Sequence, residues 1–424
     1  MFKFTNPLTT SSWFLICIYE PFSCKYSSAH SQNPWSHNSW VRSASPAPQP
    51  ANEHHPDPDP PPGQQPEQDP PVEDLLQITK CEKHIRDLSF ITALCAASLD
   101  DGTGLIGDAL TRLCDPPTEP LRIENPDIQL ALENFLALEH SSEKIYETIR
   151  ANIQKRFPDS SLPSLYWIKQ LLTEISGVTP IMEDMCINSC VAYSGPYIHL
   201  QECPECHQPW YHYAAQKWVL CTVFNTIPIG LQLQAFWWHL ETAKKMHYRV
   251  KWTQELFDEL QCNDGFVDNY DDVFSGQAYL DAIQKHRIGP DDTLIMFSID
   301  GAQLFENKKS DCWIYIWIIL HLAPNYQYKK KFVLPGTIIP GLKKPKFIES
   351  FLYPGFHHLS AIQQEGLQVW DAAQDCVFNS HLFFCIGCGD GLGLTILSNF
   401  VGHSGKCGCH MLCPFTGRRK PGGS

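Results

Sequence analysis

The sequence lacks a long hydrophobic run. A helix that crosses a bilayer needs about 18 or more consecutive apolar residues, whereas the longest run, Cys312–Ala323, is shorter and contains His321. A buried strand explains that run better. Trp13–Tyr19 could form the apolar part of a secretory signal, with Lys3 as its basic flank, but no clear small-residue cleavage site follows it. We therefore expect neither a membrane partner nor secretion.

Basic residues are also scarce. The 424 residues include 32 Lys and Arg against 46 Asp and Glu, which gives a formal net charge of −14. This balance argues against a nucleic-acid partner for the chain as a whole. The charge is uneven, however, because the residues from Asp300 onward hold 12 basic and 8 acidic side chains. A nucleic-acid surface is therefore compatible with the C-terminal part of the chain and is not expected in the acidic N-terminal part.

Cysteine, by contrast, is abundant, with 18 residues. In a chain of this length, cysteines that occur as close pairs favour a reducing compartment and metal ligation over a disulfide framework. The pattern C-x3-C-x12-C-x2-C is formed by Cys186, Cys190, Cys203 and Cys206. Two close pairs of thiolates predict a zinc-ribbon-like site with a structural Zn²⁺ ion, because four protein ligands leave no position open for a substrate. The alternatives are buried free thiols, or a site in which His207 or His212 is a ligand.

Composition and periodicity divide the chain into five regions. They are a disordered Pro-rich leader (1–75), a helical region (76–180), the zinc-ribbon-like module (181–225), a helical and acidic connector (226–290) and an α/β core (291–424). Helical spacing is clearest in Asp127–Arg156, Pro163–Ile175 and Gly230–Leu260. We interpret the helical region as a scaffold. DNA contact or multimerisation is the alternative, although no basic face supports it.

The α/β core is organised around Thr293–Leu304 (TLIMFSIDGAQL), in which a buried strand, Leu294–Phe297, is followed by Asp300. Further elements are predicted as strands at Cys312–Leu322 and Lys331–Ile339, a helix from Pro345 to Ala373, and a strand at Leu382–Cys388 that is followed by Asp390. The order strand, strand, strand, helix, strand, with an aspartate after the first and fourth strands, predicts an incomplete ribonuclease-H-like core.

Adjacent first and fourth strands would bring Asp300 and Asp390 together although 90 positions separate them. Hard divalent cations prefer oxygen ligands, and two Mg²⁺ ions about 3.5–4 Å apart can stabilise the attacking and leaving oxygens of a phosphoryl transfer. The pair therefore predicts a site for Mg²⁺ or Mn²⁺. Taken alone, Asp390 is equally well explained as a turn or helix-capping residue in a Gly-rich loop.

Four further side chains have two interpretations each. His357 and His358 could be metal ligands, but ordinary residues of a helix face explain them better. Cys385 and Cys388 lie on the last predicted strand, where alternation would place them on opposite faces. Buried thiols are the better interpretation of this pair.

Several long motifs resemble one transposase family. They include SIDGAQLFENKKSDCWIYIWIILHLAP, KKKFVLPGTIIPG, FLYPGFHHLSAIQQEGLQVWDA and VGHSGKCGCHMLCPFTGRRKPGG. Together they resemble the Plavaka-type transposases of fungal genomes, which are CACTA/EnSpm-like DNA transposons, and the resemblance is dense from about Ile181 to Ser424. It implies metal-dependent DNA cleavage and strand transfer at transposon ends, in the nucleus, with Asp300 and Asp390 as catalytic metal ligands. It also implies DNA as the partner and homo-oligomerisation.

The chain departs from the pattern that the resemblance implies. A third catalytic carboxylate is expected on a later helix, yet residues 391–424 contain no Asp or Glu. We therefore expect a C-terminally truncated transposase with little or no activity alone. The alternative is a non-enzymatic remnant that binds DNA or protein through the zinc ribbon and basic clusters. The resemblance also implies that Cys409 and Cys413 form half of a second zinc site, which His403 or Cys407 could supplement.

Short basic clusters accompany the predicted core. Each alone is typical of a solvated turn, but together they are expected to contact DNA phosphates near the aspartates. They are Lys308, Lys309, Lys329, Lys330, Lys331, Lys343, Lys344, Lys346, Arg418, Arg419 and Lys420.

Overall fold

The computed structural model describes residues 82–398 except 103, 120–122, 139–140, 215–216, 221, 304–310 and 342–343. The predicted leader therefore lies outside the described residues. So do the candidate site residues Lys308, Lys309, Lys343, His403, Cys407, Cys409, Cys413, Arg418, Arg419 and Lys420.

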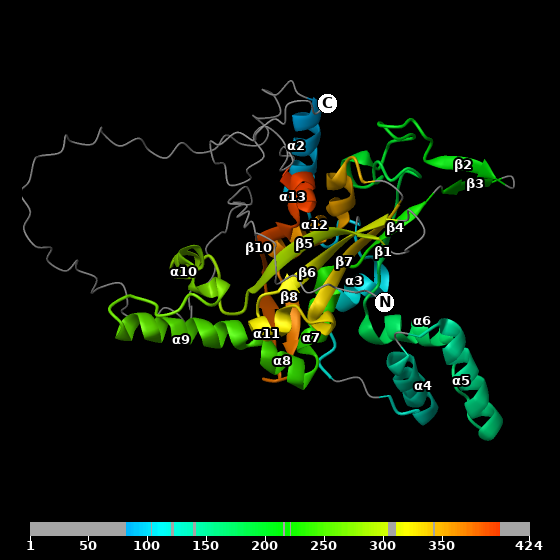
Figure 1. The fold of residues 1–424 in the computed structure, drawn as a ribbon, viewed down its shortest axis with the longest axis horizontal. Coiled ribbons are helices and arrows are strands. Elements are labelled where there is room, and N and C mark those ends of the chain that lie inside the picture. Colours follow the sequence, from blue (N-terminus) through cyan, green and yellow to red (C-terminus); the bar gives the residue numbers. More distant parts are fainter. Residues whose placement is uncertain are drawn as a thin grey trace, which may run out of the picture.

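A six-stranded mixed sheet forms the centre of the molecule (Figure 1), which confirms the predicted α/β class. Its strand order is β1-β4-β7-β6-β5-β10. In chain order, the strands are β1 Ile181–Asp184, β4 Val223–Thr226, β5 Thr293–Gln303, β6 Asp311–Ile319, β7 Val333–Pro340 and β10 Leu382–Gly389. Neighbours are antiparallel except for β10, which runs parallel to β5.

Both faces of the sheet are covered, which explains why its strands read as continuous apolar runs. On β5, Ile295, Phe297 and Ile299 belong to one core, whereas Leu294 and Met296 belong to another. The first core is completed by α3 Gly107–Cys114, α7 Ile229–Trp237 and α12 Ile348–Glu365. The second is completed by α9 Tyr248–Cys262 and α10 Gln277–Gln284. Period-2 alternation along β5 therefore distributes side chains between two helical layers.

The remaining helices are α2 Glu82–Cys95, α4 Pro126–Ala137, α5 Glu143–Arg156, α6 Leu165–Ser176, α8 Leu240–Met246, α11 Pro324–Gln327 and α13 Gly391–Ser398. Helices α4 to α6 enclose a small core of their own around Ile168 and Tyr146. The segment Asp127–Arg156, for which a helical pattern was predicted, forms two helices, α4 and α5. Asn125 caps the first of them by accepting hydrogen bonds from the backbone N–H groups of Asp127 and Ile128.

The helix predicted from Pro345 to Ala373 is wrong beyond Glu365. Gly366 adopts a positive φ of 85°, which ends α12. A hairpin follows, formed by β8 Leu367–Asp371 and β9 Cys376–Ser380. Sequence periodicity missed it because the apolar residues of the short strand also suit helical spacing.

The cysteine-rich segment is continuous with the sheet. It begins after β1 and ends before β4, which are paired antiparallel at the edge beside β7. Between them, β2 Tyr211–Ala214 and β3 Lys217–Leu220 form a separate hairpin. The cysteines therefore lie on an excursion between two strands of the central sheet. Among the described residues, no helix is long and apolar enough to cross a membrane.

A buried cation organises the chain just before β5. The guanidinium of Arg249 on α9 is inaccessible to solvent and donates hydrogen bonds to the carbonyl oxygens of Gly289, Pro290 and Asp292 at 2.7–2.9 Å. It also donates to Nε2 of His321 at 2.8 Å. Its donors are thus satisfied by acceptors that hold the entry to β5 in place.

Candidate metal centres

Two tight turns bring the four predicted cysteines together. The isolated bridges Met185–Ala192 and Glu202–Pro209 close one turn around each cysteine pair. Each turn contains one residue at positive φ, Ser189 (57°) in the first and His207 (56°) in the second. Such turns place both thiols of a pair on the same side of the backbone, so a short cysteine spacing can serve one ion.

The predicted convergence of Cys186, Cys190, Cys203 and Cys206 is confirmed. All four Sγ atoms lie within 4.8 Å of one another, and the Cys186–Cys206 pair is 3.4 Å apart. Tetrahedral zinc with Zn–S bonds of about 2.3 Å requires S···S distances of about 3.8 Å. The group can therefore hold a metal ion such as zinc after small adjustments. His207 is not part of it, since its exposed ring lies 3.8 Å from the Glu202 carboxylate, and the side chain of His212 lies outside the described residues.

Local donors favour thiolates in this group. The backbone N–H of Asn188 lies 3.4 Å from Cys186 Sγ, and its side-chain Nδ2 lies 3.4 Å from Cys206 Sγ. Burial raises the pKa of Cys203 to about 11. Burial also acts to raise the pKa of Cys206, but hydrogen bonds from Asn188, the Gln208 backbone and the neighbouring thiols lower it to about 6. Crowded thiols that oppose each other's ionisation are suited to a cation that neutralises them together.

The cysteine module is tied to the start of α12. The carbonyl oxygen of Cys190 accepts hydrogen bonds from the backbone N–H groups of Lys346 and Phe347, both at 3.0 Å. Ala192 N–H donates to Ser350 Oγ at 2.9 Å. Next to the thiols is a cavity of about 170 Å³, lined by Asn188, Cys190, Glu205, Cys206, Lys344 and Lys346. The module thus supports the loop between β7 and α12.

Asp300 and Asp390 lie at the same edge of the sheet. In the parallel pair, Gly389 is the register partner of Ile299, so the two aspartates each follow paired residues. Neighbouring strands are about 4.8 Å apart. Both aspartates are exposed. The pKa of Asp300 is raised by partial burial and further by the charge of Asp390, although a hydrogen bond from Gly301 N–H opposes the shift.

Asp390 is also the residue that caps α13. Its Oδ1 accepts a hydrogen bond from Gly393 N–H at 2.6 Å, and its carbonyl oxygen accepts one from Leu394 N–H. A Cβ atom at Gly393 would lie 2.9 Å from the Ile299 carbonyl oxygen, so only glycine fits this close approach. The capping alternative for Asp390 therefore describes its contacts among the described residues.

The aspartates form a pair and not a larger cluster. Within the described part of the chain, the cysteines are the group of three or more His, Cys, Asp or Glu side chains that could hold a metal ion. Two carboxylates can bind a divalent cation weakly, and Mg²⁺ commonly uses one or two protein carboxylates together with substrate phosphates and waters. The geometry is compatible with such a cation, and the described residues add no third Asp, Glu, His or Cys ligand to the pair.

One predicted basic cluster, Lys329–Lys331, lies away from the aspartates. Lys329, Lys330 and Lys331 follow the end of β6, whose Ile319 pairs with Ile295 at the opposite end of β5 from Asp300. Five residues of strand separate Ile295 from Asp300, so at least about 17 Å lies between the two ends. α11 and α13 accordingly occupy opposite ends of the sheet (Figure 1). The expectation of one shared DNA surface is therefore wrong for these three lysines.

Lys344 and Lys346 follow β7 at the same end as the aspartates, because Pro340 pairs with Cys312 and Cys312 with Ala302. Both lysines line the cavity beside the cysteines, and Lys346 Nζ lies 3.9 Å from the Glu205 carboxylate. A metal-bound set of four thiolates carries two net negative charges. The positive charges of Lys344 and Lys346 therefore compensate the negative charge of the cysteine module.

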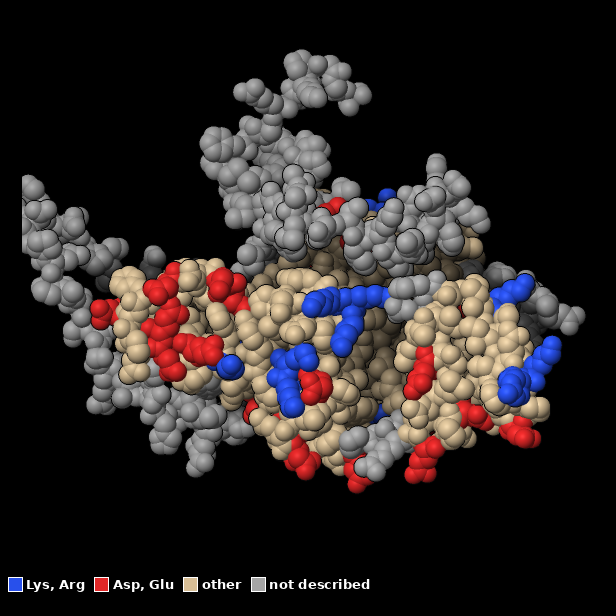
Figure 2. All heavy atoms as spheres, turned by 60° about the horizontal axis from the view of Figure 1, so that its bottom comes forward, with Lys and Arg blue, Asp and Glu red and all other residues tan. Residues whose placement is uncertain are grey.

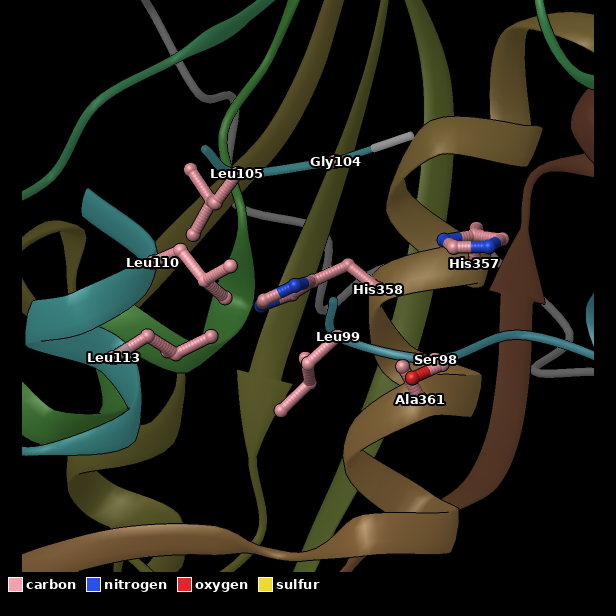
Figure 3. Close-up of a pocket in the computed structure, with 9 residues that line it drawn as sticks. All are labelled: Ser98, Leu99, Gly104, Leu105, Leu110, Leu113, His357, His358 and Ala361. Carbon is pink, nitrogen blue, oxygen red and sulfur yellow. The ribbon is translucent and has the colours of Figure 1, made fainter. Parts of the chain in front are cut away.

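The histidine pair on α12 is structural (Figure 3). His357 Nε2 lies 2.8 Å from the Asp101 carboxylate, and His358 Nε2 accepts the Gly230 N–H at 3.2 Å. Figure 3 shows the His358 ring directed toward Leu110 and Leu99, while His357 turns away from them. The preferred interpretation of ordinary helix residues fits these contacts.

The two thiols of β10 do not lie on opposite faces. Both Cys385 and Cys388 pack against the core under α9 and α10. The strand register shifts between Phe384 and Ile386, which places Cys385 in a bulge and breaks the alternation. Cys388 is buried, as expected, with Sγ 3.5 Å from Met296 Sδ.

Sequence reasoning did not predict that Lys245 and Lys329 both lie over the ring of Tyr326, with Nζ atoms 5.7 and 4.6 Å from its centroid. The Lys-Lys pair in LETAKKM was the available signal, but it lies in a region that is acidic overall.

Comparison of the chain with models of known protein families finds no match, and comparison with curated proteins finds none either. The family resemblance therefore rests on the motif residues themselves.

Proposed function

We propose that the chain is derived from a Plavaka-type DNA transposase, and that β5, β6, β7, α12 and β10 form a ribonuclease-H-like core. The observation that carries this proposal is the adjacency of Asp300, three residues before the end of β5, and Asp390, directly after the parallel strand β10. Three antiparallel strands, an intervening helix and a parallel fourth strand support it further. This is the order expected from the motif resemblance.

Asp300 and Asp390 would hold Mg²⁺ or Mn²⁺ at the edge of the sheet. A bound divalent ion supplies a Lewis acid for attack on a DNA phosphodiester and for departure of the 3′ oxygen. Burial raises the pKa of Asp300, and the charge of Asp390 raises it further; a bound cation would oppose both effects. Residues 391–424 provide no further Asp or Glu. We propose that Asp300 and Asp390 by themselves support only weak DNA cleavage and strand transfer.

The cysteine module has a structural role in this proposal. Cys186, Cys190, Cys203 and Cys206 would bind Zn²⁺ as a zinc ribbon and leave no open coordination position. Its contacts with the start of α12 would hold the β7–α12 loop at the end of the sheet where the aspartates lie. DNA, in the nucleus, is the proposed partner.

The decisive experiment is Mn²⁺-dependent nicking of supercoiled plasmid, measured together with Mn²⁺ binding by calorimetry. Asp300→Asn should lose whatever nicking the wild type has and should weaken Mn²⁺ binding. Asp258→Asn is the matched control, because Asp258 is an exposed carboxylate on α9 far from the pair in sequence. If both variants bind Mn²⁺ as the wild type does, the aspartate pair is not a metal site.

The second candidate function is non-enzymatic binding of DNA. It is favoured by the pairing of only two carboxylates and by the capping contact of Asp390. Wild-type protein that binds duplex DNA without nicking it in Mn²⁺ would support this candidate. Nicking that disappears in Asp300→Asn would support the enzymatic one.

A further inference from the structure

One sulfur of the cysteine module is open to solvent while the other three are buried. Cys186, Cys190 and Cys203 are 1%, 6% and 0% exposed, whereas Cys206 is only partly buried. Cys206 also lines the cavity of about 170 Å³ beside the module. Exposed side chains, among them Lys346, border this cavity. A small reagent can therefore reach the Cys206 sulfur while the module stays folded.

A second sulfur lies next to the accessible one. Cys186 Sγ and Cys206 Sγ are 3.4 Å apart, so they need to approach by only about 1.4 Å to reach the length of a disulfide bond. Asn188 contacts both sulfurs, with its backbone N–H 3.4 Å from Cys186 Sγ and its side-chain Nδ2 3.4 Å from Cys206 Sγ. An accessible thiolate beside a buried second thiol is the arrangement of a cysteine that can be oxidised reversibly.

We propose that Cys206 is a site of oxidation by hydrogen peroxide or a small organic hydroperoxide, with Cys186 as the cysteine that resolves the product to a disulfide. This modification is independent of the nucleic-acid chemistry proposed above. It rests on the proposed zinc role in one respect only, which is the release of the ion that accompanies it.

The oxidation proceeds in two steps. In the first, the Cys206 thiolate attacks one oxygen of the peroxide, the O–O bond breaks, and the products are a Cys206 sulfenic acid and hydroxide. In the second, the Cys186 thiolate attacks the Cys206 sulfur, the S–O bond breaks, and a disulfide and a second hydroxide form. The two thiolates supply the two electrons that reduce the peroxide. Solvent protons convert both hydroxides to water.

The disulfide removes two of the four ligands of the proposed zinc ion. Cys190 and Cys203 alone form an incomplete ligand set, which no longer retains the ion because structural zinc requires four protein ligands. The new bond joins the first cysteine turn to the second, so the two turns remain connected. A dithiol reductant reverses the reaction by thiol–disulfide exchange, and the complete ligand set can then bind zinc again.

The surroundings of Cys206 differ from those of an ordinary exposed thiol. Lys344 and Lys346 line the cavity with positive charge, which favours a step in which hydroxide leaves. Cys262 is a useful contrast, because it is exposed at the end of α9. Acidic side chains gather on the side of the molecule that α9 occupies (Figure 2). We therefore expect Cys206 to react before Cys262, although Cys262 is the more exposed of the two.

The test treats the full chain, loaded with zinc, with increasing amounts of hydrogen peroxide. Pyridylazoresorcinol reports the released Zn²⁺, and peptide mass spectrometry reports the state of each cysteine. The wild type should release its zinc as a Cys186–Cys206 disulfide forms, while Cys262 is still reduced. Dimedone, which traps sulfenic acids, should label Cys206. Dithiothreitol and added Zn²⁺ should restore the zinc content.

Two variants separate the roles of the sulfurs. Cys206→His keeps a zinc ligand and removes the accessible sulfur, so it should retain its zinc in peroxide that empties the wild type. Cys186→His keeps a ligand and removes the resolving thiol, so the dimedone adduct of Cys206 should accumulate. Cys262→Ser is the matched control and should behave as the wild type does. Zinc content and thermal melting before oxidation show whether each variant is folded.

Three results would overturn the proposal: a disulfide between any other pair of cysteines, oxidation of Cys262 before Cys206, or zinc release from folded Cys206→His as fast as from the wild type. The first two need only the wild-type chain, so the test stands if a histidine variant does not fold. Purified wild type without zinc would contradict the structural metal role proposed above. The order of cysteine oxidation would still decide this inference in that case.

Discussion

Loss of one buried cysteine should disconnect the cysteine module from the sheet. Cys203 is inaccessible to solvent, and its backbone N–H donates to the Gln208 carbonyl oxygen within the second turn. Cys203→Ser keeps the size of the side chain but replaces a thiolate with a poor zinc ligand. Because a four-ligand structural site binds Zn²⁺ only as a complete set, we expect the zinc content to fall from one ion per chain to nearly none.

The size of the effect follows from the contacts that depend on the module. Three hydrogen bonds with backbone N–H donors connect it to the start of α12: two to the Cys190 carbonyl oxygen and one from Ala192 N–H to Ser350 Oγ. At about 1 kcal/mol each, they amount to about 3 kcal/mol. A destabilisation of that size lowers the melting temperature of a domain of 150–250 residues by roughly 6 to 12 °C.

Metal analysis by mass spectrometry and thermal melting by circular dichroism measure the two quantities. Cys262→Ser is the control, since Cys262 is exposed at the end of α9 and should change neither. Chelation of the wild type should reproduce the Cys203→Ser melting temperature. A variant that retains a full zinc ion, or a chelated wild type that melts within about 2 °C of the untreated protein, would refute the reasoning.

Three further substitutions test the packing around the sites. Arg249→Met should cost about 3–5 kcal/mol in urea unfolding, because buried carbonyl acceptors lose their donor, and a cost under about 1 kcal/mol would contradict the network described. Burial lowers the pKa of His358 to about 3, so its contribution to stability is complete above the unfolded pKa of about 6.5 and is lost as the pH falls toward 3. His358→Gln, whose amide oxygen can still accept the Gly230 N–H, should reduce the loss of stability between pH 7 and 5 by about 2 kcal/mol, and identical pH profiles would exclude this role. Gly393→Ala should cost about 1–3 kcal/mol by pressing a methyl group on the Ile299 carbonyl oxygen and should weaken Mn²⁺ binding, whereas Gly104→Ala, which meets no atom within 4 Å, should be nearly neutral.

The elements with the strongest local signals were predictable. The strands β5, β6, β7 and β10 can be recognised in the sequence as apolar runs, because both of their faces are buried. The cysteine turns follow from ligand spacing alone. The β8–β9 hairpin was not predictable from periodicity, because Gly366 ends α12 where the apolar spacing suits either structure. The bulge at Cys385 was also not predictable, since nothing in the local sequence specifies a register shift.

The basic residues show why proximity in sequence to a motif is a poor guide to proximity in space. Lys329–Lys331 lie between two predicted core strands, so the sequence suggested that they accompany the aspartates. An antiparallel pair, however, sends the loop after its second strand back to the start of the first. Asp300 lies near the C-terminal end of β5 at one end of the sheet, while these lysines join β6 to β7 at the other. Lys245 from the connector reaches the same Tyr326 ring as Lys329, although the connector is acidic overall. Charge counted along the chain therefore does not show which basic side chains the sheet brings together from separate segments.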